Sequence, residues 1–163
     1  MKNTNNWKLL GLLAASIAVI GIISMLGGCA SGVNVSPAPG VTLSAAATNA
    51  IVDIKDAEQA AGVTAALAEL AASATGNTNL AATIPADLTA FDASCETAIT
   101  HIESGTLTPA GILADEQSIQ GLVTQVTASA NAVGTSPTTS TAIKSGVAQV
   151  TAKVASAKVK VTK

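Results

Sequence analysis

Residues 88–102 read LTAFDASCETAITHI, and their spacing indicates the fold of the whole chain. The apolar side chains recur at steps of three and four: Leu88, Phe91, Cys95, Ala98 and Ile102. Such steps place them on one face of an α-helix. We therefore predict an amphipathic helix with Cys95 as a small buried hydrophobe in its core face. The alternative is a thiol that pairs between chains or reacts.

Three further alanine-rich segments show related spacing. The third segment has Ile112, Ile119, Val123, Val126, Ala130 and Val133, interrupted by Glu116, and the fourth has Ile143, Val147, Val150, Val154, Ala157 and Val161. The first segment is less regular, because Ile51 and Ile54 face one way and a stripe of Val63, Leu67, Leu70 and Ala74 faces another. We expect a long helix that bends or changes partner near Gly62.

Turn residues separate these segments. Gly76, Gly105 and Gly134 follow the first three segments, as expected for glycines that end helices. Thr108-Pro109 and Ser136-Pro137 each place a capping hydroxyl before a proline at the first helical position. The start near Pro85 is ambiguous, because Ile84 is a poor cap and Asp87 could serve instead. The predicted helices are about 44–75, 85–104, 109–133 and 137–158.

Four amphipathic helices with short connections predict a mainly α fold, a four-helix up-and-down bundle over residues 43–163. The alternative is an elongated coiled coil in which heptad stripes pair between copies of the chain, a homo-oligomer. The last five residues, 159–163, alternate with period two and fit either a frayed helix end or a short strand.

The first 28 residues have the three-part layout of a secretory signal. Met1–Lys8 is polar with two lysines, Leu9–Met25 has no charge, and Leu26-Gly27-Gly28-Cys29 follows. This ending resembles the lipobox of bacterial lipoproteins. The resemblance implies cleavage before Cys29, a thioether-linked diacylglycerol on its sulfur, and acylation (palmitate) of the new amino terminus. Alternatively, residues 9–28 remain as a membrane-spanning signal helix.

The residues after Cys29 bear on where the protein resides. In Gram-negative lipoproteins an Asp after the lipidated cysteine tends to retain the protein at the inner membrane, and here that residue is Ala30. The resemblance therefore implies secretion through the inner membrane and lipid anchoring at the periplasmic face of the outer membrane. In a host with one membrane, the anchor would lie in its outer leaflet. Residues 29–42, rich in Gly, Ser and Pro, are expected to form a flexible tether.

Composition excludes several functions. Without residues 1–28 the chain keeps all ten acidic residues and six of its eight lysines, a net charge of −4, and it has no arginine. Phe91 is then the only aromatic residue. Nucleic-acid binding is not expected, because neither a positive charge nor stacking side chains support it. An aromatic-lined pocket for a cofactor is not expected either.

No catalytic or metal-binding constellation is recognisable. His101 is the only histidine. Helical geometry places it on the opposite flank from an acidic strip beside the apolar face, formed by Asp92, Glu96 and Glu103. We expect a surface histidine and a solvated acidic face, no bound metal or cofactor, and no enzymatic activity. Glu116, a carboxylate on an apolar stripe, is expected to sit near solvent at the end of that stripe.

Two functions remain. The first is a non-enzymatic structural or adaptor module, held to the membrane by acyl chains on Cys29 and contacting another envelope protein. The second rests on a resemblance to the major murein lipoprotein, which is also lipidated, alanine-rich and heptad-patterned, and whose C-terminal lysine is joined to peptidoglycan. That lysine would correspond to Lys163, although Lys160-Val161-Thr162 departs from the family's tail. Lysines 153, 158, 160 and 163 could also form a basic tip for an anionic partner.

Overall fold

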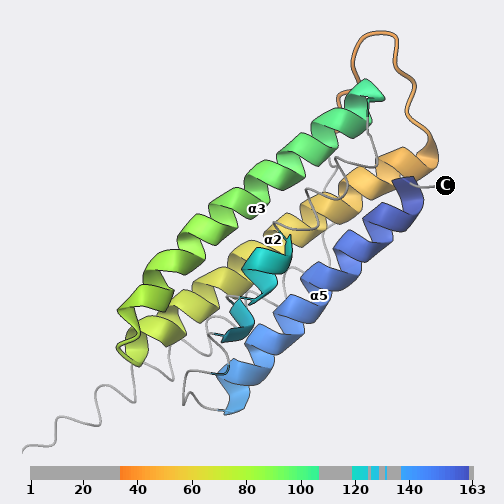
Figure 1. The fold of residues 1–163 in the computed structure, drawn as a ribbon. Helices are drawn as coiled ribbons and strands as arrows, with labels where there is room; N and C mark the ends of the chain where they lie inside the picture. Colours follow the sequence, from red (N-terminus) through yellow and green to blue (C-terminus); the bar gives the residue numbers. More distant parts are fainter. Residues whose placement is uncertain (1–33, 107–118, 125, 129–130, 132–136, 162–163) are drawn as a thin grey trace, which may run out of the picture. The chain divides into compact units, whose positions relative to one another are not determined.

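The structure is a computed structural model that describes residues 34–106, 119–124, 126–128, 131 and 137–161. It is mainly helical, and no strand occurs among these residues. Its long helices are α2 (Ala45–Ala74), α3 (Thr78–Ser104) and α5 (Pro137–Val161). Residues 119–124, 126–128 and 131 are also helical. Figure 1 shows α2, α3 and α5 lying alongside one another.

Helix α2 begins where a hydroxyl can cap it. The side chain of Ser44 accepts a hydrogen bond from the Ala47 backbone N–H at 3.1 Å, which satisfies one of the amides that lack an intrahelical partner. The predicted start of this helix near residue 44 agrees with that cap.

The buried face of α2 continues without a shift past Gly62. Ala57, Ala61, Thr64 and Ala68 are all buried, at steps of four, three and four. The predicted stripe of larger residues was wrong: Leu67 is buried, but Leu70 is 53% exposed, and Val63 and Ala74 are half-buried and exposed respectively. Small side chains occupy the contact face because they let neighbouring helices approach closely.

Helix α3 begins seven residues before the predicted start at Pro85, which was therefore wrong. Asn77 caps the helix, since its side-chain oxygen accepts from the Leu80 N–H at 3.2 Å, and Pro85 lies inside the helix. An interior proline removes one backbone hydrogen bond and costs about 3 kcal/mol. Ile84 is completely buried beside it, so tertiary packing offsets that cost.

Two of the predicted glycine stops are confirmed. Gly76 and Gly105 have φ angles of 76° and 69°, in the left-handed region. At the second stop, the Gly105 N–H bonds to the Ile102 carbonyl at 3.1 Å and the Thr106 N–H to the His101 carbonyl at 2.9 Å. These two bonds form a Schellman motif, which satisfies carbonyls at the end of the helix. Gly134 lies outside the described residues.

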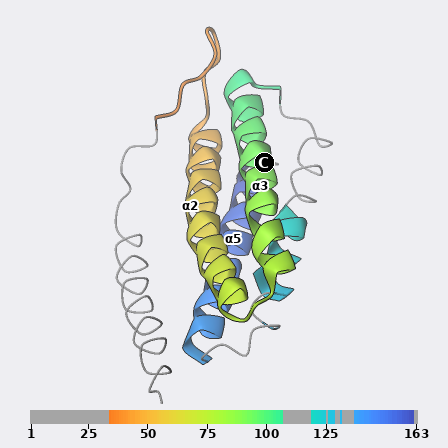
Figure 2. The same cartoon turned by 90° about the vertical axis from the view of Figure 1, so that its left-hand side faces the viewer.

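Helix α2 packs against both α3 and α5 (Figure 2). Asp53 of α2 contacts Lys160 near the end of α5, and Thr64, further along α2, lies against Gly146 nearer the start of α5. The two helices therefore run antiparallel. The largest completely buried side chains are Phe91, Ile51, Ile84 and Ile143, and alanines fill much of the remaining core. The predicted stripe on α3 is largely confirmed: Phe91, Cys95, Ala98 and Ile102 are buried, and Leu88 is half-buried.

Helix α5 extends to Val161, three residues beyond the predicted end at residue 158. Residues 159–161 are therefore helical, and the strand suggested by their alternation is excluded. Ile143, Val150 and Ala157 are buried as the spacing predicts. Contact with α2 along this length explains why the helix continues through Lys158 and Lys160.

Residues 34–43, which we call the strap, join the N-terminal part of the chain to α2. The strap contains a turn in which the Val41 N–H bonds to the Ala38 carbonyl at 2.9 Å, with Gly40 at φ 85°. It also bonds to Glu103 at the end of α3, where the tether was expected to be flexible. The flexibility of residues 29–42 stays a prediction.

Candidate functional site

The predicted anchor lies outside the described residues. This applies to Leu26, Gly27, Gly28 and Cys29, and to two other candidates, Glu116 and Lys163. The structure therefore bears on the helical domain and on the strap that leads into it.

Cys95 is confirmed as a core residue. It lies on α3 with 4% of its surface exposed, in the same face as Phe91 and Ala98. A thiol must be exposed to react, so the burial of Cys95 indicates that its role is to pack the core.

His101 is half-buried near the end of α3, rather than on the open surface as predicted. Its Nδ1 atom is buried and has no hydrogen-bond partner among the described residues. Within the same part of the chain, no group of three or more His, Cys, Asp or Glu side chains is placed to hold a metal ion.

The acidic strip on α3 is joined by a carboxylate of α2. Burial raises the pKa of Glu58, and the charges of Asp92 and Glu96 raise it further, while Lys55 opposes them. Burial together with the Glu96 charge also raises the pKa of Asp92. The solvated strip predicted from the sequence is thus partly desolvated, and its members repel one another across the α2–α3 contact.

A second charged group lies between α2 and α5, and sequence reasoning missed it. Lys153 Nζ is 2.6 Å from Asp56 Oδ2 and 3.7 Å from Asp53 Oδ1, and Lys160 Nζ bonds to Asp53 Oδ2. Asp53 is 7% exposed, which is unusual for a carboxylate. The two lysines are seven residues apart, and the two aspartates three, so each pair lies on one helical face.

These ion pairs shift the pKa values of Asp53 and Lys153. Burial alone would raise the pKa of Asp53, but hydrogen bonds from Lys160 and Ser156 and the charges of both lysines hold it below its usual value. The hydrogen bond and charge of Asp56 raise the pKa of Lys153. The positive charges of Lys153 and Lys160, two of the four lysines assigned to a basic tip, are therefore balanced by aspartates of the same chain.

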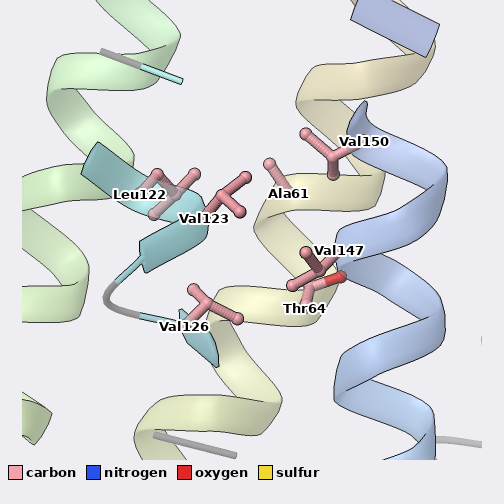
Figure 3. Close-up of a pocket in the computed structure, with 7 residues that line it drawn as sticks. All are labelled: Ala61, Thr64, Leu122, Val123, Val126, Val147 and Val150. Carbon is pink, nitrogen blue, oxygen red and sulfur yellow. The ribbon is translucent and has the colours of Figure 1, made fainter. Parts of the chain in front are cut away.

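A small apolar pocket lies between α2, α5 and the helical residues 119–124 and 126–128 (Figure 3). Its lining residues are Ala61, Thr64, Leu122, Val123, Val126, Val147 and Val150. Its cavity volume is about 10 Å³, the lower limit for one water molecule, and the Thr64 hydroxyl already donates to the Ala60 carbonyl at 2.6 Å. This space fits a packing defect and not a ligand.

Among the described helices, none is both long enough and apolar enough to cross a membrane. Comparison with known proteins gave no match: no family model, curated protein or solved structure is detectably similar to this chain.

Proposed function

We propose that this chain is a bacterial envelope lipoprotein, anchored through acyl chains on Cys29. The observation that carries this proposal is the motif Leu26-Gly27-Gly28-Cys29 at the end of an uncharged run that follows a lysine-containing start. Two or three acyl chains hold a protein durably at a membrane, since each buried methylene contributes about 0.8 kcal/mol.

The anchor is tested by changing the single atom that would carry the lipid. Cys29→Ser should abolish incorporation of labelled palmitate and leave an unprocessed precursor, because serine offers no sulfur for the thioether. Cys95→Ser is the matched control, and it should be labelled and processed like the wild type. Palmitate incorporation that survives in the Cys29→Ser variant would refute the anchor.

The helical domain acts, in this proposal, as a non-enzymatic structural or adaptor module for another envelope protein. The proposal includes a four-helix up-and-down bundle completed by the helical residues 119–124, 126–128 and 131. Supporting it are the antiparallel contact of α2 with α5, the tight turn at Gly76, and burial of Leu122 and Val126 against α2 and α5. Sedimentation of the purified protein tests it, because a compact bundle behaves as a monomer and an elongated coiled coil as an oligomer.

The proposed location is the periplasmic face of the outer membrane, supported by Ala30 after the anchoring cysteine. Membrane fractionation tests this location. Ala30→Asp should move the protein to the inner-membrane fraction if the sorting rule implied by the resemblance applies.

Attachment to peptidoglycan through Lys163 receives less support. Helix α5 returns antiparallel to α2, and Lys160 contacts Asp53 near the start of α2. The end of α5 therefore lies near the strap that leads to the anchor. A tether that bridges membrane and wall gains most when its two attachment points are far apart. Recovery of a muropeptide joined to Lys163 from digested cell walls would reverse this preference.

A further inference from the structure

The strap is bound to the last turns of α3 through both the side chain and the backbone of Glu103. The Ser36 N–H donates to Glu103 Oε1 at 2.9 Å, and the Ala38 N–H donates to the Glu103 carbonyl at 3.2 Å. The first bond joins an amide to a carboxylate, the stronger class of hydrogen bond. One residue thus holds two points of the connection between the N-terminal part of the chain and the helical domain.

The strap is shaped in advance for this contact. Pro39 and Gly40 form the centre of the turn from Ala38 to Val41, where proline fixes its own φ and glycine accepts the left-handed conformation. Proline restricts the unbound segment, so less conformational entropy is lost at Pro39 when the strap binds. Val35, Ala38, Val41 and Leu43 are half-buried, which adds apolar contact to the two hydrogen bonds.

Binding of the strap shortens the free chain between Cys29 and the helical domain. From Cys29 to Ser44 the chain can span about 50 Å when fully extended, whereas from Cys29 to Ser36 it can span only about 25 Å. We infer that Glu103 is a latch that fixes the strap to α3 and so sets how far the helical domain can stand from its membrane anchor. The latch itself is a property of the strap and α3, and its effect on reach rests on the proposed lipidation of Cys29.

The latch has a test that does not depend on lipidation. In the full chain, Glu103→Ala should speed amide hydrogen exchange at Ser36 about 3- to 10-fold, because exposure to solvent reduces the net strength of this bond to that of an ordinary hydrogen bond. Glu103→Gln keeps an acceptor and should retain most of the protection. Glu69→Ala, which removes an exposed carboxylate near the other end of α2, is the matched control and should leave Ser36 unchanged.

Elastase provides a second readout, because it cleaves after small aliphatic residues that proline does not follow, here Val35 and Val41. Cleavage within the strap should be slow in the wild type and in Glu69→Ala, and faster in Glu103→Ala. The latch is overturned if Ser36 in the wild type exchanges as fast as an unstructured peptide. Identical exchange and cleavage in the wild type and Glu103→Ala overturn it as well.

The effect on reach is measured on the lipidated protein, bound to a supported bilayer of phosphatidylethanolamine and phosphatidylglycerol. Neutron reflectometry should show the helical domain of Glu103→Ala in a broader layer than the wild type. The broadening should stay below the roughly 25 Å gained on full release of the strap, because the backbone bond from Ala38 to residue 103 is retained. Equal layer profiles would overturn the role of the latch in reach. Failure of the wild type to bind the bilayer would refute the lipid anchor and leave the exchange result intact.

Discussion

The close contact between Gly146 on α5 and Thr64 on α2 leads to a specific prediction about the free energy of unfolding. A Cβ atom added at Gly146 would lie 2.1 Å from Thr64 Oγ1, 2.9 Å from its Cγ2 and 3.0 Å from its Cβ. Rotation of the Thr64 side chain would move the first two atoms but not the third, and its hydroxyl is held by the Ala60 carbonyl. Gly146→Ala must therefore push α2 and α5 apart.

The size of the effect follows from two opposing contributions. Overpacking of this kind costs about 1–3 kcal/mol, and the short distances favour the upper part of that range. Alanine in place of glycine within a helix contributes about 1 kcal/mol in the other direction. We expect Gly146→Ala to lower the free energy of unfolding by about 1–2 kcal/mol.

The control is Gly62→Ala, which makes the same chemical change inside α2. No heavy atom lies within 4 Å of an added Cβ at Gly62, so only the helical preference acts and the protein should gain about 0.5–1 kcal/mol. Thr64→Ala removes the two closest atoms and should recover at least half of the loss when it is combined with Gly146→Ala.

Urea unfolding followed by far-ultraviolet circular dichroism measures five proteins: the wild type, the three single variants and the Thr64→Ala/Gly146→Ala double variant. Linear extrapolation gives their free energies of unfolding. The two Gly→Ala variants should differ by about 2 kcal/mol with opposite signs relative to the wild type. Equal stabilisation by both would refute the close approach of α2 and α5. Additive effects of Thr64→Ala and Gly146→Ala would show that these residues are not in contact.

Three further predictions concern charge and burial. The pKa of Asp53 is lowered in the folded protein, so its contribution to stability is present above its unfolded pKa and is lost as the pH falls through the folded value. Asp53→Asn should lower the neutral-pH free energy of unfolding by about 2 kcal/mol, because Lys160 loses a charge-assisted partner, and should flatten the acid limb of a pH titration. The pKa of Glu58 is raised in the folded protein, so its ionised form lowers stability above that pKa and protonation removes the loss. Glu58→Gln should therefore raise the free energy of unfolding by about 0.5 kcal/mol at neutral pH. This gain should vanish as the pH is lowered. Thiol reagents should label Cys95 far more slowly in native than in urea-unfolded protein, and rapid native labelling would show that it is not in the core.

The sequence predicted best those features that depend on local chemistry. Gly76 and Gly105 were identified as helix ends because few other residues tolerate a positive φ, and the stripe through Phe91 and Cys95 was found because large apolar residues mark a buried face. The start of α3 was misplaced, since Pro85 is a strong local signal for a helix start and only the burial of Ile84 outweighs it.

The contact face of α2 was misread for a different reason. Alanine occurs on every side of this helix, so the larger Leu70 defined a stripe that the fold leaves exposed. The pairing of Asp53 with Lys160 depends on which helices become neighbours, and no local pattern contains that information. Cys29 was proposed from its motif alone, and it lies outside the described residues.

The pairing of α2 with α5 also has a consequence for how the chain acquires its structure. Lys153 bonds to Asp56 across 97 positions of sequence, and Lys160 to Asp53 across 107. Closing a loop of that length costs roughly 4 kcal/mol in chain entropy, whereas α2 and α3 are joined by a turn of three residues. We therefore expect α2 and α3 to associate first as a helical hairpin, with Asp53 hydrated and the alanine face of α2 partly open to water. Folding is completed only when α5 docks, so a chain that is delivered amino terminus first stays incompletely folded until the residues of α5 have been delivered.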